Sequence, residues 1–384
     1  MRRRLHRVAW EEVKQTMSFR EEIIVLASQP GANVREICRR FQVSAKTFYK
    51  WVKRARSGNG SLENRSRRPR KSPRQTSAEM ESKILQVRHI RPGWGARKIR
   101  RVLRNQGEAR LPATSTVHRI LQRTGQIDPT QSQKHQAWQR FEHEAPNQLW
   151  QMDLKGWFTT LDQRRCNPLT VLDDHSRYAV CLRACVDQRT ETVQHQLIAT
   201  FQRYGLPERM TMDNGSPWGD DWQHPYTPLT VWLIRLGIRI SHSRPFHPQT
   251  QGKDERFHRT LEGDLLRWHR FRDLDHVQRH FDDYRHVYNH ERPHQALGLE
   301  VPASRYRMSP RGFPQRLPVI EYDTDAIVRT VQTKGRIHYA GKVFHVSKAF
   351  RGYPVALRQT TEDGILDVFF CQNNIGRINL HEQQ

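Results

Sequence analysis

The sequence predicts a multidomain protein: all-α units towards the N-terminus, a central α/β core, and a small β-barrel at the C-terminal end. Before about residue 128, apolar residues recur at helical spacing between Pro-Gly and Gly breaks. From about residue 138, strand-like runs alternate with helix-like runs, which is typical of an α/β sheet. Beyond residue 322, short alternating segments are separated by tight turns, as in a small barrel.

The charge balance points to a polyanionic partner. Lys and Arg total 65 against 39 Asp and Glu, a formal net charge of +26 in 384 residues. Nucleic acid is the first candidate and an acidic membrane surface the second. No run approaches the roughly 18 apolar residues of a spanning helix, so no membrane partner is expected. The 5 cysteines form no CxxC pair, which favours a reducing cytoplasm over a disulfide framework.

Residues 1–56 are expected to form a three-helix DNA-binding domain of the helix-turn-helix kind. Pro30-Gly31 ends the first helix, Asn33 is a candidate N-cap of the second, and Ser44 is a candidate N-cap of the third. In such a motif the last helix enters the major groove. An ordinary three-helix bundle with a solvated basic face is the alternative. The candidate DNA-binding side chains on the last helix are Lys46, Thr47, Tyr49, Lys50 and Lys53.

Residues 57–76 are rich in Gly, Ser, Pro and Arg and are predicted to form a basic flexible linker. Residues 77–128 repeat the three-helix pattern, so we expect a second helix-turn-helix domain; a structural helical bundle is the alternative. Two such units on a tether would read a composite DNA site. The candidate DNA-binding residues of the second domain are His118, Arg119, Gln122 and Arg123.

Three acidic residues in the α/β region, residues 140–310, suggest catalysis on phosphodiesters. Asp153 lies in a strand-like run, Asp213 ends another beside an Asn-Gly turn, and Glu255 begins an amphipathic helix. Carboxylates held by rigid elements at one point would bind two Mg²⁺ ions, which prefer oxygen ligands and stabilise both the attacking and the leaving oxygen. A solvated surface acid is the alternative for each. Rival acids nearby are Asp173, Asp174, Asp220, Asp221, Asp254 and Glu262.

The motifs around these acids resemble those of bacterial insertion-sequence transposases of the DDE, or retroviral-integrase, superfamily. The matching stretches are "WQMDLKG", "VLDDHSRYAV", "YGLPERMTMDNGSPW", "HPQTQGKDERFHRTL" and "YNHERPHQALGLEVPASRY". The resemblance implies an RNase H-like core with Asp153, Asp213 and Glu255 as the catalytic, metal-binding residues. It also implies two Mg²⁺ ions, for which Mn²⁺ would substitute. Lys253 matches a position expected to touch DNA near the reacting phosphate.

The resemblance further implies the reaction and its partners. Members of the family hydrolyse the element ends, and a 3′-hydroxyl then attacks target DNA. The expected partners are therefore double-stranded DNA at the terminal inverted repeats and at the target, with further copies of the chain as a dimer or higher oligomer. A bacterial cytoplasmic, nucleoid-associated location follows. Residues 322–384 would be an SH3-like barrel for DNA binding or assembly.

Two departures from the family pattern stand out. The spacer between Asp213 and Glu255 is longer than usual, which we attribute to a loop insertion at "GDDWQHPYTPL". The paired His and Cys of the retroviral N-terminal zinc domain are absent, and helix-turn-helix units take their place. The segment containing Arg292, Pro293 and His294 is expected to dock the last core helix onto the sheet rather than to carry chemistry.

Other functions remain open from the sequence. A DNA-binding regulator with an inactive core is one, and an RNase H-type nuclease that cuts without joining is another. A recombinase with a covalent Tyr or Ser nucleophile is a third, and its chemistry would need no metal.

Overall fold

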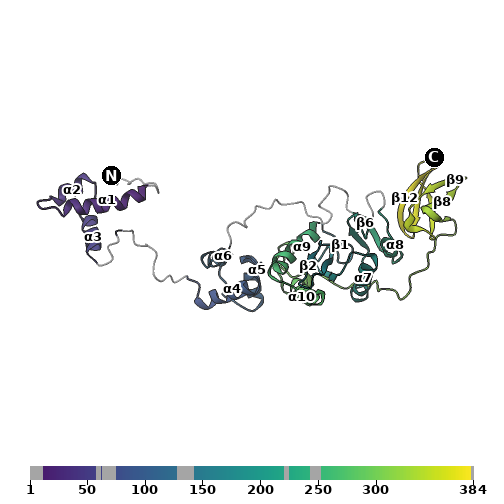
Figure 1. The fold of residues 1–384 in the computed structure, drawn as a ribbon, viewed down its shortest axis with the longest axis horizontal. Coiled ribbons are helices and arrows are strands. Elements are labelled where there is room, and N and C mark those ends of the chain that lie inside the picture. The colour runs from purple at the N-terminus through teal and green to yellow at the C-terminus, as the bar shows by residue number, and fades with distance from the viewer. Residues whose placement is uncertain are drawn as a thin grey trace. The chain divides into compact units, whose positions relative to one another are not determined.

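The computed structural model describes residues 12–57, 62, 75–127, 142–219, 225–242 and 252–381. The chain divides into two compact units, Met1–Gln75 and Thr76–Gln384. Figure 1 colours the elements by their order along the chain. Most of the predicted linker, residues 57–76, lies outside the described residues, as do the rival acids Asp220 and Asp221.

The first unit contains the three predicted helices, α1 (Glu12–Ala27), α2 (Val34–Arg40) and α3 (Ala45–Arg56). The Asn33 side chain caps α2 by accepting the N–H groups of Arg35 and Glu36, and the Ser44 hydroxyl caps α3. Both caps agree with the sequence-based prediction. The core lies between the helices and is formed by Ile23, Cys38 and Phe48, each at most 5% exposed.

The second unit begins with α4 (Ala78–Ile90), α5 (Ala96–Asn105) and α6 (Thr114–Arg123). Their shared core includes Ile84, Ile99 and Val117. Helix α6 begins without a side-chain cap, because its N-cap residue is Ala113. Three helices with a common apolar core match the predicted helical unit.

The α/β core is built on one mixed sheet. Its strands are β1 (Trp150–Leu154), β2 (Phe158–Thr159), β3 (Arg165–Asp173), β4 (Ala179–Cys185), β5 (Arg209–Met212) and β6 (Arg239–His242). Strand β3 pairs antiparallel with β1 and with β4. Strand β5 lies parallel to β1, and β6 lies parallel to β5. The strand order is therefore β4-β3-β1-β5-β6. The short strand β2 pairs antiparallel with the first residues of β3.

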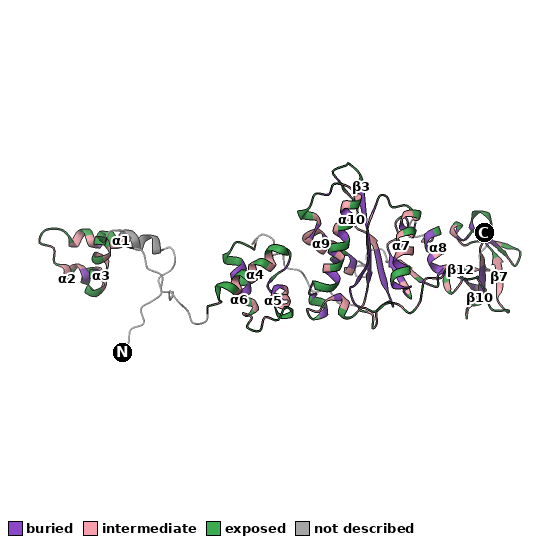
Figure 2. Ribbon diagram, turned by 90° about the horizontal axis from the view of Figure 1, so that it is seen from below, coloured by how far each residue is buried: buried purple, intermediate pink, exposed green. Residues whose placement is uncertain are grey.

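Helices cover both faces of this sheet (Figure 2). On one face lie α7 (Thr190–Tyr204) and α8 (Pro228–Arg235), packed on apolar side chains of β1 and β3 such as Met152 and Val171. On the other face lie α9 (Gly252–Asp264) and α10 (Leu274–His286). Because side chains alternate along a strand, the face under α9 receives Gln151, Asp153 and Thr170.

The segment after α10 docks against the sheet and against α9. Asn289, in the π-helical turn η4 (Val287–Glu291), is 1% exposed and exchanges hydrogen bonds with the backbone N–H and C=O of Ala179 at 2.8 and 3.0 Å. The guanidinium of Arg292 donates to Asp264 at the end of α9, at 2.9 Å. His294 is 8% exposed and lies 3.3 Å from the carbonyl oxygen of Tyr288. These contacts agree with a docking role for this segment.

The C-terminal strands are β7 (Ile327–Thr330), β8 (Arg336–Tyr339), β9 (Lys342–His345), β10 (Pro354–Gln359), β11 (Ile365–Phe370) and β12 (Asn373–Asn379). All of these were expected from the alternating segments. They form a four-stranded sheet, β12-β11-β10-β7, and a β8-β9 hairpin around one apolar core. Val231 and Ile234 of α8 join that core, so the C-terminal sheets pack on the α/β region through α8.

Two general expectations can be compared with this fold. Among the described residues, no helix combines the length and the apolar character needed to span a membrane. Cys181 and Cys185 are each 2% exposed and unpaired, which agrees with the expectation that the cysteines do not form a disulfide framework.

Candidate active site

The three predicted carboxylates lie on rigid elements at one edge of the sheet. Asp153 is in β1, Asp213 follows the last residue of β5, and Glu255 is in the first turn of α9. Strands β1 and β5 are parallel neighbours, so Asp153 and Asp213 emerge at the same edge. Helix α9 contacts β1 and β3, and its buried residues Phe257 and Leu261 join the apolar cluster that includes Leu172 of β3.

The charges of the other two carboxylates act on Asp153. Burial, the charge of Asp213 and, to a smaller extent, the charge of Glu255 together raise the pKa of Asp153 to about 7, against a hydrogen bond from the Leu154 N–H at 2.8 Å. A half-buried carboxyl between two further acids is a site that a cation would stabilise.

Asp213 is oriented by groups on both sides. Its carboxylate accepts the Gly215 N–H at 3.0 Å, which closes a short turn after β5. On the neighbouring strand β6, His242 Nδ1 donates to the Asp213 carbonyl oxygen at 2.9 Å.

A second polar group lies directly beneath Asp153. Asp254 is 0% exposed, and its carboxyl oxygens lie 3.2 and 3.1 Å from the Thr170 hydroxyl. His258 Nε2 is 2.8 Å from the same hydroxyl, and His258 Nδ1 is 3.9 Å from Asp153. One potential ligand atom from each of Asp153, Asp254 and His258 lies within 4.8 Å of the other two. Sequence reasoning treated Asp254 as a rival acid and missed His258, although their spacing of four places them on one helix face.

Burial shapes the protonation of this group. Burial and the nearby charge of Asp153 raise the pKa of Asp254 well above its ordinary value. Burial and the charge of Lys155 lower the pKa of His258 to about 4. Burial therefore favours the uncharged form of both groups. Asp254 is a buried hydrogen-bonding group, whereas its neighbour Glu255 is exposed.

The rival acids at the end of β3 have structural partners. Asp173 accepts the N–H groups of Asn147 at 2.7 Å and Ser176 at 2.8 Å, which fixes the turn from β3 into β4. Asp174 is 3% exposed and accepts from the side chains of Gln151, His143 and Lys253. Neither residue is free to act as a solvated surface acid.

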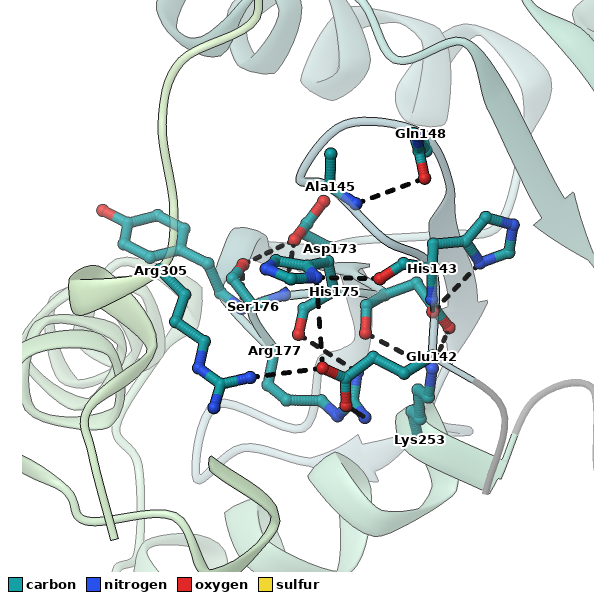
Figure 3. Close-up of polar contacts among 12 residues, drawn as sticks. Glu142, His143, Ala145, Gln148, Asp173, His175, Ser176, Arg177, Lys253 and Arg305 are labelled. Atoms are coloured by element: carbon teal, nitrogen blue, oxygen red, sulfur yellow. Dashed lines mark hydrogen bonds and ion pairs between the residues drawn. The ribbon is translucent and has the colours of Figure 1, made fainter. Parts of the chain in front are cut away.

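Lys253 is held by Asp174 at the start of α9. Its ammonium pairs with the Asp174 carboxylate and also lies 3.3 Å from the Asp174 carbonyl oxygen. Figure 3 shows His143 and Lys253 reaching this turn, while Glu142 lies between Arg177 and Arg305. Burial would raise the pKa of Asp174, but the Lys253 ammonium and the His143 hydrogen bonds hold it below its usual range. The predicted DNA contact of Lys253 stays a prediction.

The candidate DNA-binding residues lie on the described helices α3 and α6. On α3, Thr47 is half-buried and its hydroxyl lies 2.8 Å from that of the cap residue Ser44. On α6, Arg123 pairs with Glu81. The remaining candidates are exposed: Lys46, Tyr49, Lys50 and Lys53 on α3, and His118, Arg119 and Gln122 on α6.

A cavity of about 710 Å³ opens beside β1, two residues beyond Asp153. The loop of residues 155–161 forms one wall and the end of α9 with the following turn forms the other. Lys155 and Glu262 pair across it at 2.7 Å, and Trp157 is 56% exposed with the Arg165 guanidinium 4.3 Å from its ring centroid.

Comparison with known families covers most of these regions. Residues 143–248 and 236–302 each match an integrase core domain family. Residues 19–70 match a helix-turn-helix domain family, and residues 47–121 match a homeodomain-like domain family. These matches define the class: the chain belongs to the integrase superfamily and carries an RNase H-like core. Residues 326–384 match the C-terminal domain of IS481 family transposases. Within the superfamily, the chain therefore belongs with the insertion-sequence DDE transposases.

Individual similar proteins are more distant. The insertion element IS407 uncharacterized 31.7 kDa protein of Burkholderia multivorans is 25% identical over 159 residues, 41% of this chain. The chain spans about half of that curated relative, 55% of its length.

Two solved structures share low similarity with the chain. The HTLV-2 integrase catalytic core domain in complex with magnesium (trimeric form) is 13% identical, with a TM-score of 0.31, over 43% of this chain and 99% of that one. The simian T-cell lymphotropic virus intasome in complex with PP2A regulatory subunit B56 gamma is 16% identical, with a TM-score of 0.34. The match covers 75% of this chain and 91% of that one. TM-scores below 0.5 do not establish a common fold, so the fold assignment rests on the strand order and the family matches.

Proposed function

We propose that this protein is a transposase that cuts the phosphodiester bonds at the ends of an insertion sequence and joins the freed 3′-hydroxyl to target DNA. One observation carries the proposal: Asp153 in β1 and Asp213 directly after its parallel neighbour β5 emerge at the same edge of the sheet, and the first turn of α9, which packs on β1, carries Glu255. The formal charge of +26 supplies the attraction for DNA.

The donor set fits divalent magnesium. Asp153, Asp213 and Glu255 offer hard oxygen ligands, and their mutual repulsion in a half-buried site favours cation binding. Two Mg²⁺ ions bound there would neutralise charge on the reacting phosphate and align the attacking and leaving oxygens. Mn²⁺ would substitute because it accepts the same ligands.

The fold holds the three carboxylates in fixed positions. Neighbouring parallel strands hold Asp153 and Asp213, and His242 anchors the backbone of Asp213. Helix α9 presents Glu255 from above the sheet. Such rigidity matters because a misplacement of about 1 Å in a catalytic constellation costs about 100-fold in rate. The cavity next to β1, two residues beyond Asp153, is lined by Lys155, Arg267 and Arg270, whose positive charges suit a phosphate backbone.

Binding to the element ends is assigned to the helix-turn-helix regions. The exposed basic faces of α3 and α6 suit the major groove and the adjacent phosphates. Both ends of an element must be handled together, so we propose that the DNA-bound form is a dimer or higher oligomer acting in the bacterial cytoplasm on the nucleoid.

Cleavage of a linear DNA that carries the element's terminal inverted repeats tests this proposal. We expect cleavage at the element ends in Mg²⁺ or Mn²⁺, none in EDTA, and none with Asp153→Asn, while that variant still binds the ends. Activity that survives EDTA would indicate a covalent recombinase. End binding without cleavage in any divalent metal would indicate a regulator with an inactive core.

A further inference from the structure

Asp174 connects the two elements that carry Asp153 and Glu255. Its carboxylate accepts the Gln151 side-chain N–H at 2.8 Å, and Gln151 lies two residues before Asp153 on β1. The same oxygen, Oδ1, accepts the Lys253 ammonium, and Lys253 lies two residues before Glu255 on α9. One buried oxygen of Asp174 therefore accepts hydrogen bonds from both β1 and α9, the two elements that contain Asp153 and Glu255.

Further contacts fix Asp174 itself. Its other oxygen, Oδ2, accepts the His143 backbone N–H at 3.0 Å and lies 3.1 Å from His143 Nδ1. Its backbone N–H donates to the Leu149 carbonyl at 2.9 Å, and its carbonyl oxygen accepts from Lys253. With 3% exposure and partners on every side, Asp174 cannot move without moving β1 or α9.

We propose that Asp174 is a positioning residue that sets the separation of Asp153 and Glu255 through Gln151 and Lys253. This inference rests on the proposed function, because it concerns the same site. Asp174 does not touch the reacting atoms. It acts on metal binding by holding the ligands at the spacing that two divalent ions require.

The proposal also gives Lys253 a role that differs from a DNA contact. The Lys253 side chain is 17% exposed and its ammonium is engaged with a buried carboxylate. Removing it would leave the Asp174 charge buried and without its cation, and that is costly for the local structure. Helix α9 would then be free to shift at the end that bears Glu255.

Mn²⁺ binding to the full chain, followed by electron paramagnetic resonance, tests the proposal without relying on activity. We expect Asp174→Asn and Lys253→Met each to weaken Mn²⁺ binding by about tenfold or more, the usual effect of removing a group that orients metal ligands. Lys253→Arg should restore much of the loss. Asp264→Asn breaks another buried ion pair, at the far end of α9, and should leave Mn²⁺ binding unchanged.

The Lys253→Met variant distinguishes a positioning role of Lys253 from the direct electrostatic effect of its positive charge on cation binding. Losing a positive charge near the site would by itself tighten cation binding, whereas losing the clamp weakens it. In the double variant Asp174→Asn/Lys253→Met the combined loss should be smaller than the product of the single losses, because both act through one contact. End binding to DNA should stay within about twofold of wild type in all these variants.

Each outcome supports or overturns the positioning role of Asp174 and Lys253. Unchanged or tighter Mn²⁺ binding in Lys253→Met would overturn the positioning role, and weaker DNA binding with normal Mn²⁺ binding would make Lys253 a DNA contact. If Asp174→Asn fails to fold, Gln151→Met and Lys253→Met carry the test. A wild-type chain that binds no Mn²⁺ would refute the proposed function together with this inference. Wild-type binding that Asp174→Asn leaves unchanged would refute this inference alone.

Discussion

The hydroxyl of Thr170 on β3 lies 3.1 and 3.2 Å from the two carboxyl oxygens of Asp254 on α9. The same hydroxyl donates to the Asp153 carbonyl at 3.0 Å. The contact thus ties the helix to the two strands beside Asp153. It also separates Asp254 and Glu255, which are adjacent in sequence: Asp254 is buried against Thr170, whereas Glu255 is exposed.

Substitution of each α9 acid should separate these roles. Glu255→Gln should lower Mg²⁺-dependent end cleavage by more than about 100-fold, because even groups that only orient ligands account for about 10–100-fold. Asp254→Asn should lower it far less, since an amide has the same shape as a carboxyl whose neutral form burial favours, and it keeps a partner for Thr170. Initial rates on end-containing DNA give the comparison. A larger loss in Asp254→Asn would make Asp254 the metal ligand.

The contribution of Asp153 to the stability of the metal-free protein should fall as pH rises from about 4 to 7. Burial, together with Asp213 and Glu255, raises the pKa of Asp153 to about 7, so the folded chain keeps a proton that the unfolded chain releases in this window. Asp254 adds a slope of the same sign, whereas His258, with its lowered pKa, adds a slope of the opposite sign. The Asp153 contribution is therefore isolated by comparison: the free energy of unfolding, measured in denaturant with EDTA, should change with pH in a more negative direction in wild type than in Asp153→Asn. An equal slope in that variant would contradict the raised pKa.

Metal affinity should show the opposite trend. Mg²⁺ competes with the proton on Asp153, so binding should strengthen as pH rises through the same range. Calorimetric titration of Mg²⁺ at several pH values would reveal this. Affinity independent of pH between about 5 and 8 would show that Asp153 is already ionised in the metal-free protein.

Exposed lysines of α3 should contribute to DNA affinity through phosphates. Lys50→Ala should weaken binding to the element ends and reduce the slope of log affinity against log salt by about 1. Lys50→Arg keeps the charge and should keep the slope. Fluorescence anisotropy over a salt series measures both variants. An unchanged slope in Lys50→Ala would place the DNA on a different face of the unit.

Asn289→Ala should destabilise the second unit. It removes the partner of both backbone polar groups of Ala179 at the edge of β4, and leaving a buried group unsatisfied costs about 1–3 kcal/mol. Gln295→Ala, at an exposed position nearby, should stay within about 0.5 kcal/mol of wild type. Chemical denaturation gives both values. Equal stability of the two variants would mean that this segment does not dock the core.

The elements that the sequence predicted well are those whose signal is local. Alternating runs located the C-terminal strands, and Asn33 and Ser44 marked helix starts because their side chains bond groups two or three residues away. The start of α6 has no such local signal, because Ala113 occupies its cap position.

The contacts around the site could not be read from the sequence in the same way. Asp174 binds Gln151, Lys253 and His143, residues that only the folded sheet brings together. In the sequence Asp174 is one of two adjacent acids in a strand-like run, with no local sign that separates it from Asp173. Motif resemblance pointed to Asp153, Asp213 and Glu255, while the supporting network depends on long-range pairing of β1, β3 and α9.

Strand transfer is the most direct test of the central claim that these three carboxylates form one metal-dependent joining site. Pre-cleaved element ends with an exposed 3′-hydroxyl are incubated with target DNA, Mg²⁺ and the full chain. The proposal predicts joined product with wild type and none with Asp153→Asn, Asp213→Asn or Glu255→Gln, all of which should still bind the ends. Hydrolysis without any joined product, or joining by Asp153→Asn at the wild-type rate, would contradict it.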